Sequence, residues 1–166
     1  DGKTALHLAC IHKYSELALK ILDNPSCNPG QVDDSWSTAL MWSIIGELDL
    51  VSLKILANPS GNPWQINSAG CTALTLACKC GRRKIAMKML EMPVCNLGQA
   101  DGQGNTALIY ACKNGLREVA LKLLDTPLSL PWKVNEEGKT ALAYAQEQPR
   151  MQAVVDKRTA PEKQEV

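Results

Sequence analysis

Residues 104–127 read GNTALIYACKNGLREVALKLLDTP, and the tripeptide Thr-Ala-Leu inside this stretch decides the fold. The tripeptide recurs along the 166-residue chain at a constant interval of 34 residues (38 − 4 = 34). Its five copies occupy residues 4–6, 38–40, 72–74, 106–108 and 140–142. A fixed period of this length means that each unit is one supersecondary element, which buries its apolar face only by stacking on its neighbours. The sequence therefore predicts an elongated solenoid with a long open surface.

Each unit has the pattern of two short helices. Thr106 is a predicted helix N-cap, and Gly115 ends the helix that follows it. Apolar residues lie on one face of this first helix, at Ala107, Leu108, Ala111 and Cys112. The second helix repeats the spacing with Val119, Ala120, Leu123 and Leu124, which correspond in the first unit to Leu17, Ala18, Ile21 and Leu22. We expect both faces to be core.

The connection between units is long and rich in turn-forming residues. Fifteen residues separate Leu22 from Thr38, which is too many for a structureless link in a compact array, so we expect an ordered hairpin or turn that projects. A proline stops the second helix at the same place in four units, at Pro25, Pro59, Pro93 and Pro127. Turn residues recur five positions before the threonine, at Asp33, Asn67, Asp101 and Asn135.

Composition argues against several partner classes. The chain is 45% hydrophobic and 21% charged with a net charge of +1, an ordinary balance that argues against docking to nucleic acid or an anionic membrane. The apolar runs are short and interrupted, so no membrane span is expected. Of the seven cysteines, Cys10, Cys78 and Cys112 occupy one equivalent repeat position. This placement indicates buried small side chains in a reducing compartment rather than disulfides.

No metal or cofactor site is expected. Cys71, Cys78 and Cys80 are the only closely spaced cysteines, and they lack a fourth ligand at structural-zinc spacing. His7 and His12 are the only histidines, and neither has a nucleophile or carboxylate at a spacing that indicates a catalytic relay. A phosphate-binding glycine loop is also missing. The sequence therefore predicts that this segment is not an enzyme.

The unit as a whole resembles the ankyrin repeat. The resemblance rests on a loop that ends in Gly-x-Thr, a helix that begins Thr-x-Leu-x-x-Ala, a glycine break and a second leucine-rich helix. It covers residues 1–157 and implies an all-α solenoid of about five helix-turn-helix units with projecting hairpins. The units span about residues 1–33, 34–67, 68–101, 102–135 and 136–157. Hairpins and first helices would line a concave face that binds another protein.

Some residues depart from the ankyrin pattern. The family's Thr-Pro-Leu-His is Thr-Ala-Leu throughout, and its histidine remains only as His7, which the resemblance implies ties the first loop through a hydrogen bond. The glycine between the two helices is replaced by Lys13 and Glu47. An Asn-Pro-x-Gln element lengthens the loops at residues 28–31 and 62–65. This variant is similar to the long ankyrin arrays of giant DNA viruses, which implies action in an infected host's cytosol.

The ends of the array differ from its middle. Pro149 stands where the inter-helix glycine is expected, so the last unit reads as a C-terminal cap with a short second helix at about residues 150–156. Residues 158–166 are charged and lack apolar periodicity, and we expect a disordered tail. The first residues open in the middle of a motif, from which we expect further units upstream.

Candidate contact residues are those that vary within the regular frame, just before and seven or eight residues after each threonine. We selected Trp36, Ile45, Lys79, Lys113, Asn105 and Asn114. The alternative is drift at solvent-exposed positions. Trp36 replaces a turn glycine and would either anchor an interface or, the interpretation we favour, fold over the neighbouring loop.

Other regular features are interpreted as structural. We expect Trp64 and Trp132 to pack along the loop edge, and Trp42 to lie in the core or on the groove floor. Lysines recur on the second helices at Lys20, Lys54, Lys88 and Lys122. We interpret them as a solvated convex face, with Glu16 and Glu118 placed for helix pairs with Lys20 and Lys122.

These observations predict a protein-recognition module that acts as an adaptor, scaffold or inhibitor, monomeric and cytoplasmic. Two alternatives stay open. The array could be a structural spacer without a private binding surface, or the binding arm of a larger enzyme or ubiquitin-ligase adaptor whose catalytic part lies elsewhere. The partner is expected to be another protein of unknown identity.

Overall fold

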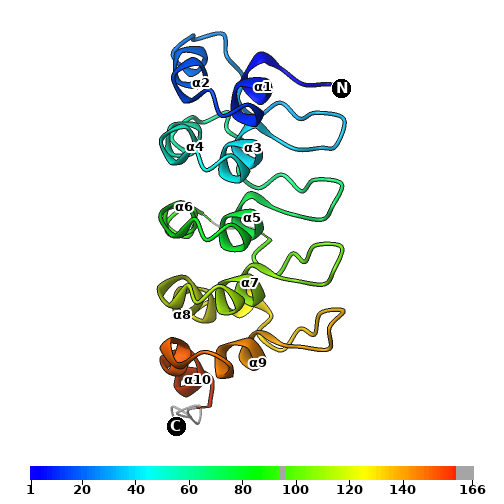
Figure 1. Ribbon diagram of the computed structural model, residues 1–166, viewed down its shortest axis with the longest axis vertical. Helices are drawn as coiled ribbons and strands as arrows, with labels where there is room; N and C mark the ends of the chain where they lie inside the picture. The colour runs from blue at the N-terminus through cyan, green and yellow to red at the C-terminus, as the bar shows by residue number, and fades with distance from the viewer. Residues whose placement is uncertain (94–95, 160–166) are drawn as a thin grey trace.

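The computed structural model describes residues 1–93 and 96–159, which form an elongated stack of helix pairs (Figure 1). Within these residues there are ten α-helices and two 3-10 helices but no β-strand, so the predicted all-helical solenoid is confirmed. The inner helices, beside the hairpins, are α1 (Ala5–Ile11), α3 (Ala39–Ile45), α5 (Ala73–Lys79), α7 (Ala107–Lys113) and α9 (Ala141–Gln146). The outer helices are α2 (Ser15–Leu22), α4 (Asp49–Leu56), α6 (Arg83–Met89), α8 (Arg117–Leu124) and α10 (Gln152–Thr159).

The threonine of each unit caps an inner helix, as the sequence predicts. Its hydroxyl accepts a hydrogen bond from the backbone N–H three residues on, for example Thr72 from Thr75 at 3.1 Å. This contact satisfies one of the N–H groups that an α-helix leaves without an intrahelical partner. The same cap is present at Thr4, Thr38, Thr106 and Thr140. The caps therefore start every inner helix in register.

The predicted turn residues close the hairpins. Asp33 Oδ1 accepts hydrogen bonds from the backbone N–H groups of Ser35 at 2.9 Å and Ser37 at 3.0 Å. The same two contacts recur at Asn67, Asp101 and Asn135. One side-chain oxygen thus satisfies two backbone donors of each tip, the use for which Asp and Asn are favoured in turns.

Neighbouring hairpins are also joined to each other. The backbone N–H of Ser68 donates to the carbonyl of Ser35 at 2.9 Å, which links the tips of the second and third units. The equivalent bonds run from Gly102 to Ala69 and from Glu136 to Gln103. All hairpins consequently project on the same side of the helices (Figure 1). The hairpins and the inner helices therefore form the two sides of a surface that extends along the whole array.

The turn between inner and outer helix uses a left-handed backbone conformation in every unit from the first to the fourth. Gly81 and Gly115 adopt it with φ of 69° and 65°. Lys13 and Glu47, which replace the expected glycines, adopt it as well, with φ of 59° and 64°. A side chain with a Cβ atom is strained in this region, so the two substitutions lower stability without changing the fold.

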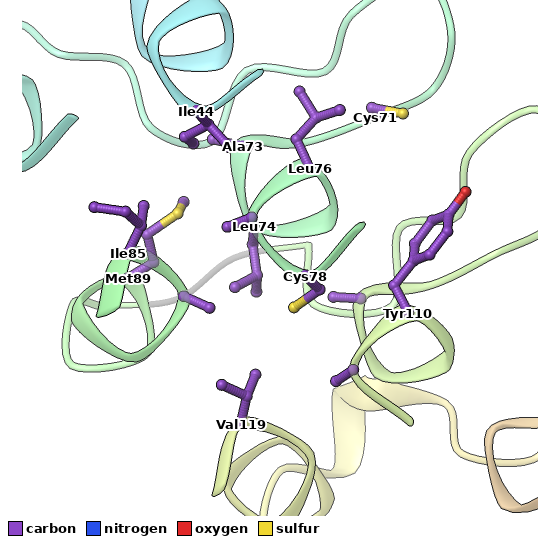
Figure 2. Packing of buried hydrophobic residues seen from close by; sticks show 14 of the residues in the cluster. Ile44, Cys71, Ala73, Leu74, Leu76, Cys78, Ile85, Met89, Tyr110 and Val119 are labelled. Carbon is purple, nitrogen blue, oxygen red and sulfur yellow. The ribbon is translucent and has the colours of Figure 1, made fainter. Parts of the chain in front are cut away.

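The core is a row of apolar side chains between inner and outer helices. Figure 2 shows Ile85 and Met89 on α6 facing Leu74 on α5, with Val119 of the next outer helix below them. Ile85, Met89 and Val119 have no exposed surface. Their layer repeats from unit to unit, so each pair of helices is buried by the pairs on both sides.

The first unit contradicts one core prediction. Leu17 is equivalent to the fully buried Val51, Ile85 and Val119, but 49% of its surface is exposed. The reason is its position in α2 at the end of the stack, where no further helix pair covers it (Figure 1). The prediction that the three equivalent cysteines are buried is confirmed, because Cys10, Cys78 and Cys112 are fully buried. Burial raises the pKa of Cys10 and Cys112 to about 12, which keeps both as neutral thiols.

The fifth unit ends the array differently. A 3-10 helix, η2 (Pro149–Met151), leads directly into α10, so Pro149 begins a helical segment where the other units have their left-handed turn. Helix α10 ends at Thr159, beyond the expected end near residue 156. A second 3-10 helix, η1 (Pro127–Ser129), precedes the last hairpin. Residues 160–166 of the expected tail lie outside the described residues.

Candidate protein-interaction surface

The surface between the hairpins and the inner helices is held together by polar contacts from both sides. We call it the concave face. The indole Nε1 of Trp42 on α3 donates to Asp33 Oδ2 in the hairpin at 2.9 Å, and the hydroxyl of Tyr110 on α7 donates to Asp101 Oδ2 at 2.7 Å. Each acidic residue therefore fixes a hairpin with one oxygen and an aromatic side chain with the other.

These contacts determine the charge state of Asp33 and Tyr110. Burial alone would raise the pKa of Asp33, but the hydrogen bonds from Ser37, Trp42 and Ser35 outweigh it and hold that pKa below its ordinary value. Burial and the bond to Asp101 both raise the pKa of Tyr110. Where the hairpins meet the inner helices, Asp33 is therefore ionised and Tyr110 is protonated. Each has its hydrogen-bond partner.

The floor of the concave face is formed by the residue four positions after each threonine. Figure 2 shows Leu76 and Tyr110 on the hairpin side of their helices, opposite the core-facing Ile85 and Val119. Leu76, Tyr110 and Tyr144 are buried, and Trp42 is half-buried, which confirms its predicted place in the floor. Leu8, the equivalent of the first unit, is exposed.

The residue seven positions after each threonine ends or follows the inner helix and forms an outer row. This row reads Ile11, Ile45, Lys79, Lys113 and Glu147. Ile45 is 44% exposed, and Lys79 and Lys113 are exposed, so three of the six predicted contact residues lie in it. Lys79 Nζ lies 5.4 Å from the ring centroid of Tyr110 and Lys113 Nζ lies 5.2 Å from that of Tyr144. Both separations suit a cation–π contact.

The exposure of Trp36 contradicts the interpretation that its ring folds over the neighbouring loop. Its ring does not fold away, because 61% of its surface is exposed. Its φ of 59° is left-handed, like that of the glycines at the equivalent positions of the other hairpins, Gly2, Gly70, Gly104 and Gly138. The sequence therefore places a large apolar residue where its backbone is strained and its ring meets water.

The prediction that Asn105 contacts a partner is wrong. Only 3% of its surface is exposed, because the next hairpin covers it. Asn135 Nδ2 donates to Asn105 Oδ1 at 2.8 Å, and Asn105 Nδ2 donates to the Tyr110 hydroxyl at 3.4 Å. Asn105 therefore joins two units from within. Asn114 is exposed, although its Nδ2 donates to the carbonyls of Cys78 at 2.9 Å and Lys79 at 3.0 Å.

The C-terminal half of the concave face is a network of charge pairs around Tyr144. Glu137 Oε2 accepts from the Tyr144 hydroxyl at 2.9 Å, and Glu137 Oε1 lies 3.1 Å from Lys113 Nζ. Lys139 Nζ lies 5.1 Å from the Tyr144 ring centroid and pairs with Glu147 at 2.6 Å. The bond from Lys113 and the bond from Tyr144 lower the pKa of Glu137, and the bond to Glu137 raises that of Lys113. Lys113 and Lys139 are therefore neutralised within the chain.

His7 makes the hydrogen bonds that the ankyrin resemblance implies, and it reaches further. Its Nδ1 accepts from the backbone N–H of Thr4 at 3.0 Å, and its Nε2 lies 3.2 Å from the carbonyl of Ser37. These partners fix the neutral tautomer with the proton on Nε2. Burial lowers the pKa of His7, against an opposing effect of Asp33. His7 thus links its own loop to the second hairpin.

Of the regular lysines on the outer helices, Lys54 forms an inter-unit pair, whereas Lys88 pairs with Glu91 of its own unit. Lys54 pairs with Asp23 of the preceding unit at 2.5 Å. Glu118 pairs with Arg83 of the preceding unit at 3.0 Å, not with Lys122 four residues away in its own helix as predicted. Such exposed pairs contribute little to stability. They leave the convex face with both signs of charge, consistent with a solvated surface.

The two equivalent loop tryptophans differ from each other. Trp64 is half-buried and packs against the core, as predicted, whereas 61% of Trp132 is exposed. Trp132 stands at the rim of an apolar cavity of about 230 Å³ between the last two helix pairs, lined also by Leu108, Cys112 and Val154. At the equivalent site, Ile44 takes the place of Cys112. The cavity forms because Cys112 is smaller than isoleucine and because the Trp132 ring is largely exposed instead of packed against the core.

The described residues contain neither a metal-binding cluster nor a membrane-spanning helix. Over residues 1–93 and 96–159, no three His, Cys, Asp or Glu side chains gather in a way that could hold a metal ion. Cys71 is buried and Cys80 half-buried, so the three closely spaced cysteines do not share an open site. None of the described helices combines the length and apolar character needed to cross a bilayer.

The family follows from comparison with known proteins. Residues 6–98 match the family model described as ankyrin repeats (3 copies). The chain is an ankyrin repeat protein. Among solved structures, this ankyrin repeat protein is similar to the crystal structure of EF0377, also an ankyrin repeat protein, with a TM-score of 0.73. The match covers 92% of this chain and 78% of that one at 22% sequence identity, so it shows the fold alone. No curated protein matches the chain.

Ankyrin repeats are in general non-catalytic modules for protein–protein interaction. Their stacked units form an extended concave surface on a rigid frame. In this chain the candidate contact residues that lie on or beside that surface are Trp36, Ile45, Lys79, Lys113 and Asn114.

Proposed function

We propose that this ankyrin repeat protein binds a partner protein through its concave face, as an adaptor, scaffold or inhibitor. The proposal rests on the backbone conformation and the exposure of Trp36. Its left-handed backbone and its 61% exposed ring both cost free energy, and glycine would avoid both. A residue that lowers the stability of its own hairpin while presenting a large apolar surface has the properties of an interface anchor.

The surroundings of Trp36 suit this role. Ile45, in the same unit, is 44% exposed at the end of α3. The hairpin that carries Trp36 is fixed by Asp33, by the bond between the second and third hairpins, and by His7 from the first unit. A preorganised surface of this kind loses little conformational entropy on binding. An apolar anchor on a rigid hairpin is therefore placed for a specific contact.

We further propose a monomer that acts in a reducing compartment such as the cytosol, in a host cell if the likeness to viral arrays holds. The fully buried thiols of Cys10, Cys78 and Cys112 support the reducing compartment, since each packs as a small apolar side chain in its own unit.

Affinity capture with matched variants tests the proposed binding surface. Three baits are exposed to a cytosolic extract: the unmodified chain, the double variant Trp36→Gly with Ile45→Ser, and Leu50→Ser. Leu50 lies on the outer helix α4 of the same unit and is 69% exposed, so it controls for a general loss of exposed apolar surface. We expect a protein held by the unmodified and Leu50→Ser baits and lost with the double variant. Equal capture by all three baits would contradict the proposed surface, and the absence of specific capture by any bait would favour a spacer.

A further inference from the structure

The concave face changes character along the array. On the floor and in the outer row of its N-terminal half the side chains are apolar: Leu8 and Ile45 are exposed, and Ile11 and Trp42 are half-buried. Trp36 is exposed on the second hairpin, where Asp34 and Ser35 are exposed too, and Lys3 of the first hairpin is half-buried. From the third unit onward, the row that begins with Ile11 and Ile45 continues with Lys79, Lys113 and Glu147. Along the outer row an apolar half is thus followed by a charged half.

The lysines of the charged half are not equivalent. Lys113 is neutralised by Glu137 at 3.1 Å, and Lys139 by Glu147 at 2.6 Å. In the described part of the chain, by contrast, no carboxylate oxygen lies within 4.0 Å of Lys79 Nζ. Lys79 is instead held 5.4 Å from the centroid of the Tyr110 ring on the groove floor. It is exposed and next in the row to Ile45.

The carboxylates near Lys79 already have partners within the chain, and Asp101 accepts from the Tyr110 hydroxyl at 2.7 Å. Arg82, three residues further on, pairs with Glu47 at 3.4 Å and with Asp49 at 3.8 Å, and so uses the nearby carboxylates of the second unit. The ammonium of Lys79 lowers the pKa of Cys71 and Cys80, but burial raises the pKa of both thiols by more, and at Cys71 the carboxylate of Asp101 also outweighs Lys79. Lys79 is exposed at the end of α5, where a partner would approach.

From this arrangement we propose that the partner presents an amphipathic segment: apolar side chains that contact Trp36 and Ile45, followed by a carboxylate that pairs with Lys79. Because stacked helices are separated by roughly 10 Å, the apolar and acidic groups of the partner lie about that far apart. The apolar group faces the N-terminal half of the array. This inference rests on the proposed function and specifies the chemistry of the partner.

Charge complementarity sets the order of the two groups. A segment in the reverse orientation would place its carboxylate against Trp36 and Ile45, where it loses hydration. A carboxylate aimed at Lys113 would have to displace Glu137. Lys79 therefore determines the specificity for an acidic side chain in the partner. Trp36 and Ile45 provide the apolar contact.

A polyanion fits the surface poorly. Nucleic acid binding draws its affinity from several phosphate contacts, whereas Lys113 and Lys139 in this half are already paired and the chain carries a net charge of only +1. The observations therefore favour a protein segment.

Selection from a displayed library of random peptides tests the inference without a known partner. The library is selected separately against the unmodified chain, Lys79→Glu, and Lys84→Glu. Lys84 is an exposed lysine on the outer helix α6 of the same unit and serves as the matched control. We expect peptides from the unmodified chain and from Lys84→Glu to share an apolar residue followed by Asp or Glu. Selection on Lys79→Glu should replace the acidic residue by Lys or Arg.

Affinity measurements on the selected peptides complete the test. A peptide selected on the unmodified chain should lose about tenfold in affinity or more on Lys79→Glu, because like charges then face each other, and should regain it when its own carboxylate is exchanged for lysine. If Lys79→Glu leaves peptide sequence and affinity unchanged while Trp36→Gly with Ile45→Ser abolishes binding, the charge inference is wrong and the proposed surface stands. If the double variant has no effect either, the proposed surface fails as well. Tighter binding of single-stranded DNA than of any selected peptide would also overturn the inference.

Discussion

Lys79 Nζ lies 5.4 Å from the ring centroid of Tyr110, so the last residue of one inner helix covers an aromatic side chain of the next. Lys113 and Tyr144 repeat the relationship at 5.2 Å. Both tyrosines are only 5% exposed, and a lysine of the preceding unit lies over each ring. The concave face is therefore ordered by contacts between units, and its residues also contribute to stacking.

Removing the Tyr110 hydroxyl should test the polar link between helix and hairpin. Tyr110→Phe leaves Asp101 Oδ2, in a buried residue, without its donor at 2.7 Å, and we expect a loss of about 1–3 kcal/mol in the free energy of unfolding. Urea denaturation measures this loss. Tyr144→Phe is the control, because its acceptor Glu137 is exposed and is solvated when released, so its effect should be smaller. Equal losses would show that the burial of Asp101 is unimportant.

The stability of the first unit should depend on pH through His7. Its pKa is lowered in the folded state by burial, so its contribution is complete above the unfolded pKa of about 6.5 and is lost as the pH falls below that value. Protonation would also place a proton on Nδ1, against the Thr4 N–H. His7→Thr copies Thr75 of the third unit, whose hydroxyl bonds that of Thr72 at 2.9 Å. Denaturation curves of the variant should lack this pH dependence, and an unchanged slope would assign it to other groups.

Glycine at the inter-helix turn should stabilise the array. Lys13→Gly relieves a left-handed conformation with φ of 59°, and we expect a gain of about 1 kcal/mol. The reverse change, Gly81→Lys, should cost a similar amount, and the cause would be backbone strain alone, because a Cβ atom at Gly81 meets nothing within 4 Å. Thermal unfolding of both variants measures the two effects. Changes of the same sign would exclude strain as the common cause.

Equivalent core positions should respond differently according to their place in the stack. Leu17 and Ile85 occupy the same repeat position, but Leu17 is 49% exposed and Ile85 is fully buried. Ile85→Ala should cost about 2–5 kcal/mol, and Leu17→Ala clearly less. Denaturant unfolding compares the two losses directly. A larger loss at Leu17 would mean that a further unit or chain covers α2 under the conditions of the experiment.

The repeat frame could be predicted from sequence because each of its signals is local. Thr106 caps its helix through a hydrogen bond to a residue only three positions away. Asp101 closes its hairpin through a hydrogen bond to a residue four positions away. With five copies in phase, such short-range chemistry fixes element types and boundaries. The departures at Lys13 and Glu47 did not alter the turn, since the stacked helices on both sides outweigh the strain of one residue.

The surface could be predicted only in part, because exposure depends on the neighbouring unit. Asn105 and Asn114 are both polar residues at variable positions, yet Asn135 of the next hairpin buries the first and leaves the second exposed. Trp36 keeps its ring in solvent although packing over the next loop was the favoured interpretation. The pairing of Lys113 with Glu137 leaves Lys79 as the unpaired lysine of the outer row. This pairing spans 24 residues (137 − 113 = 24) and follows from no helix-spacing rule.

Hydrogen exchange on a complex tests the central claim most directly. The amide exchange of the array is compared with and without a peptide selected on the unmodified chain. We predict slower exchange in the hairpin that contains Trp36 and at the ends of α3 and α5, where Ile45 and Lys79 lie, and unchanged exchange in the outer helices α4 and α6. Protection confined to α4 and α6, with the hairpin unaffected, would contradict recognition by the concave face.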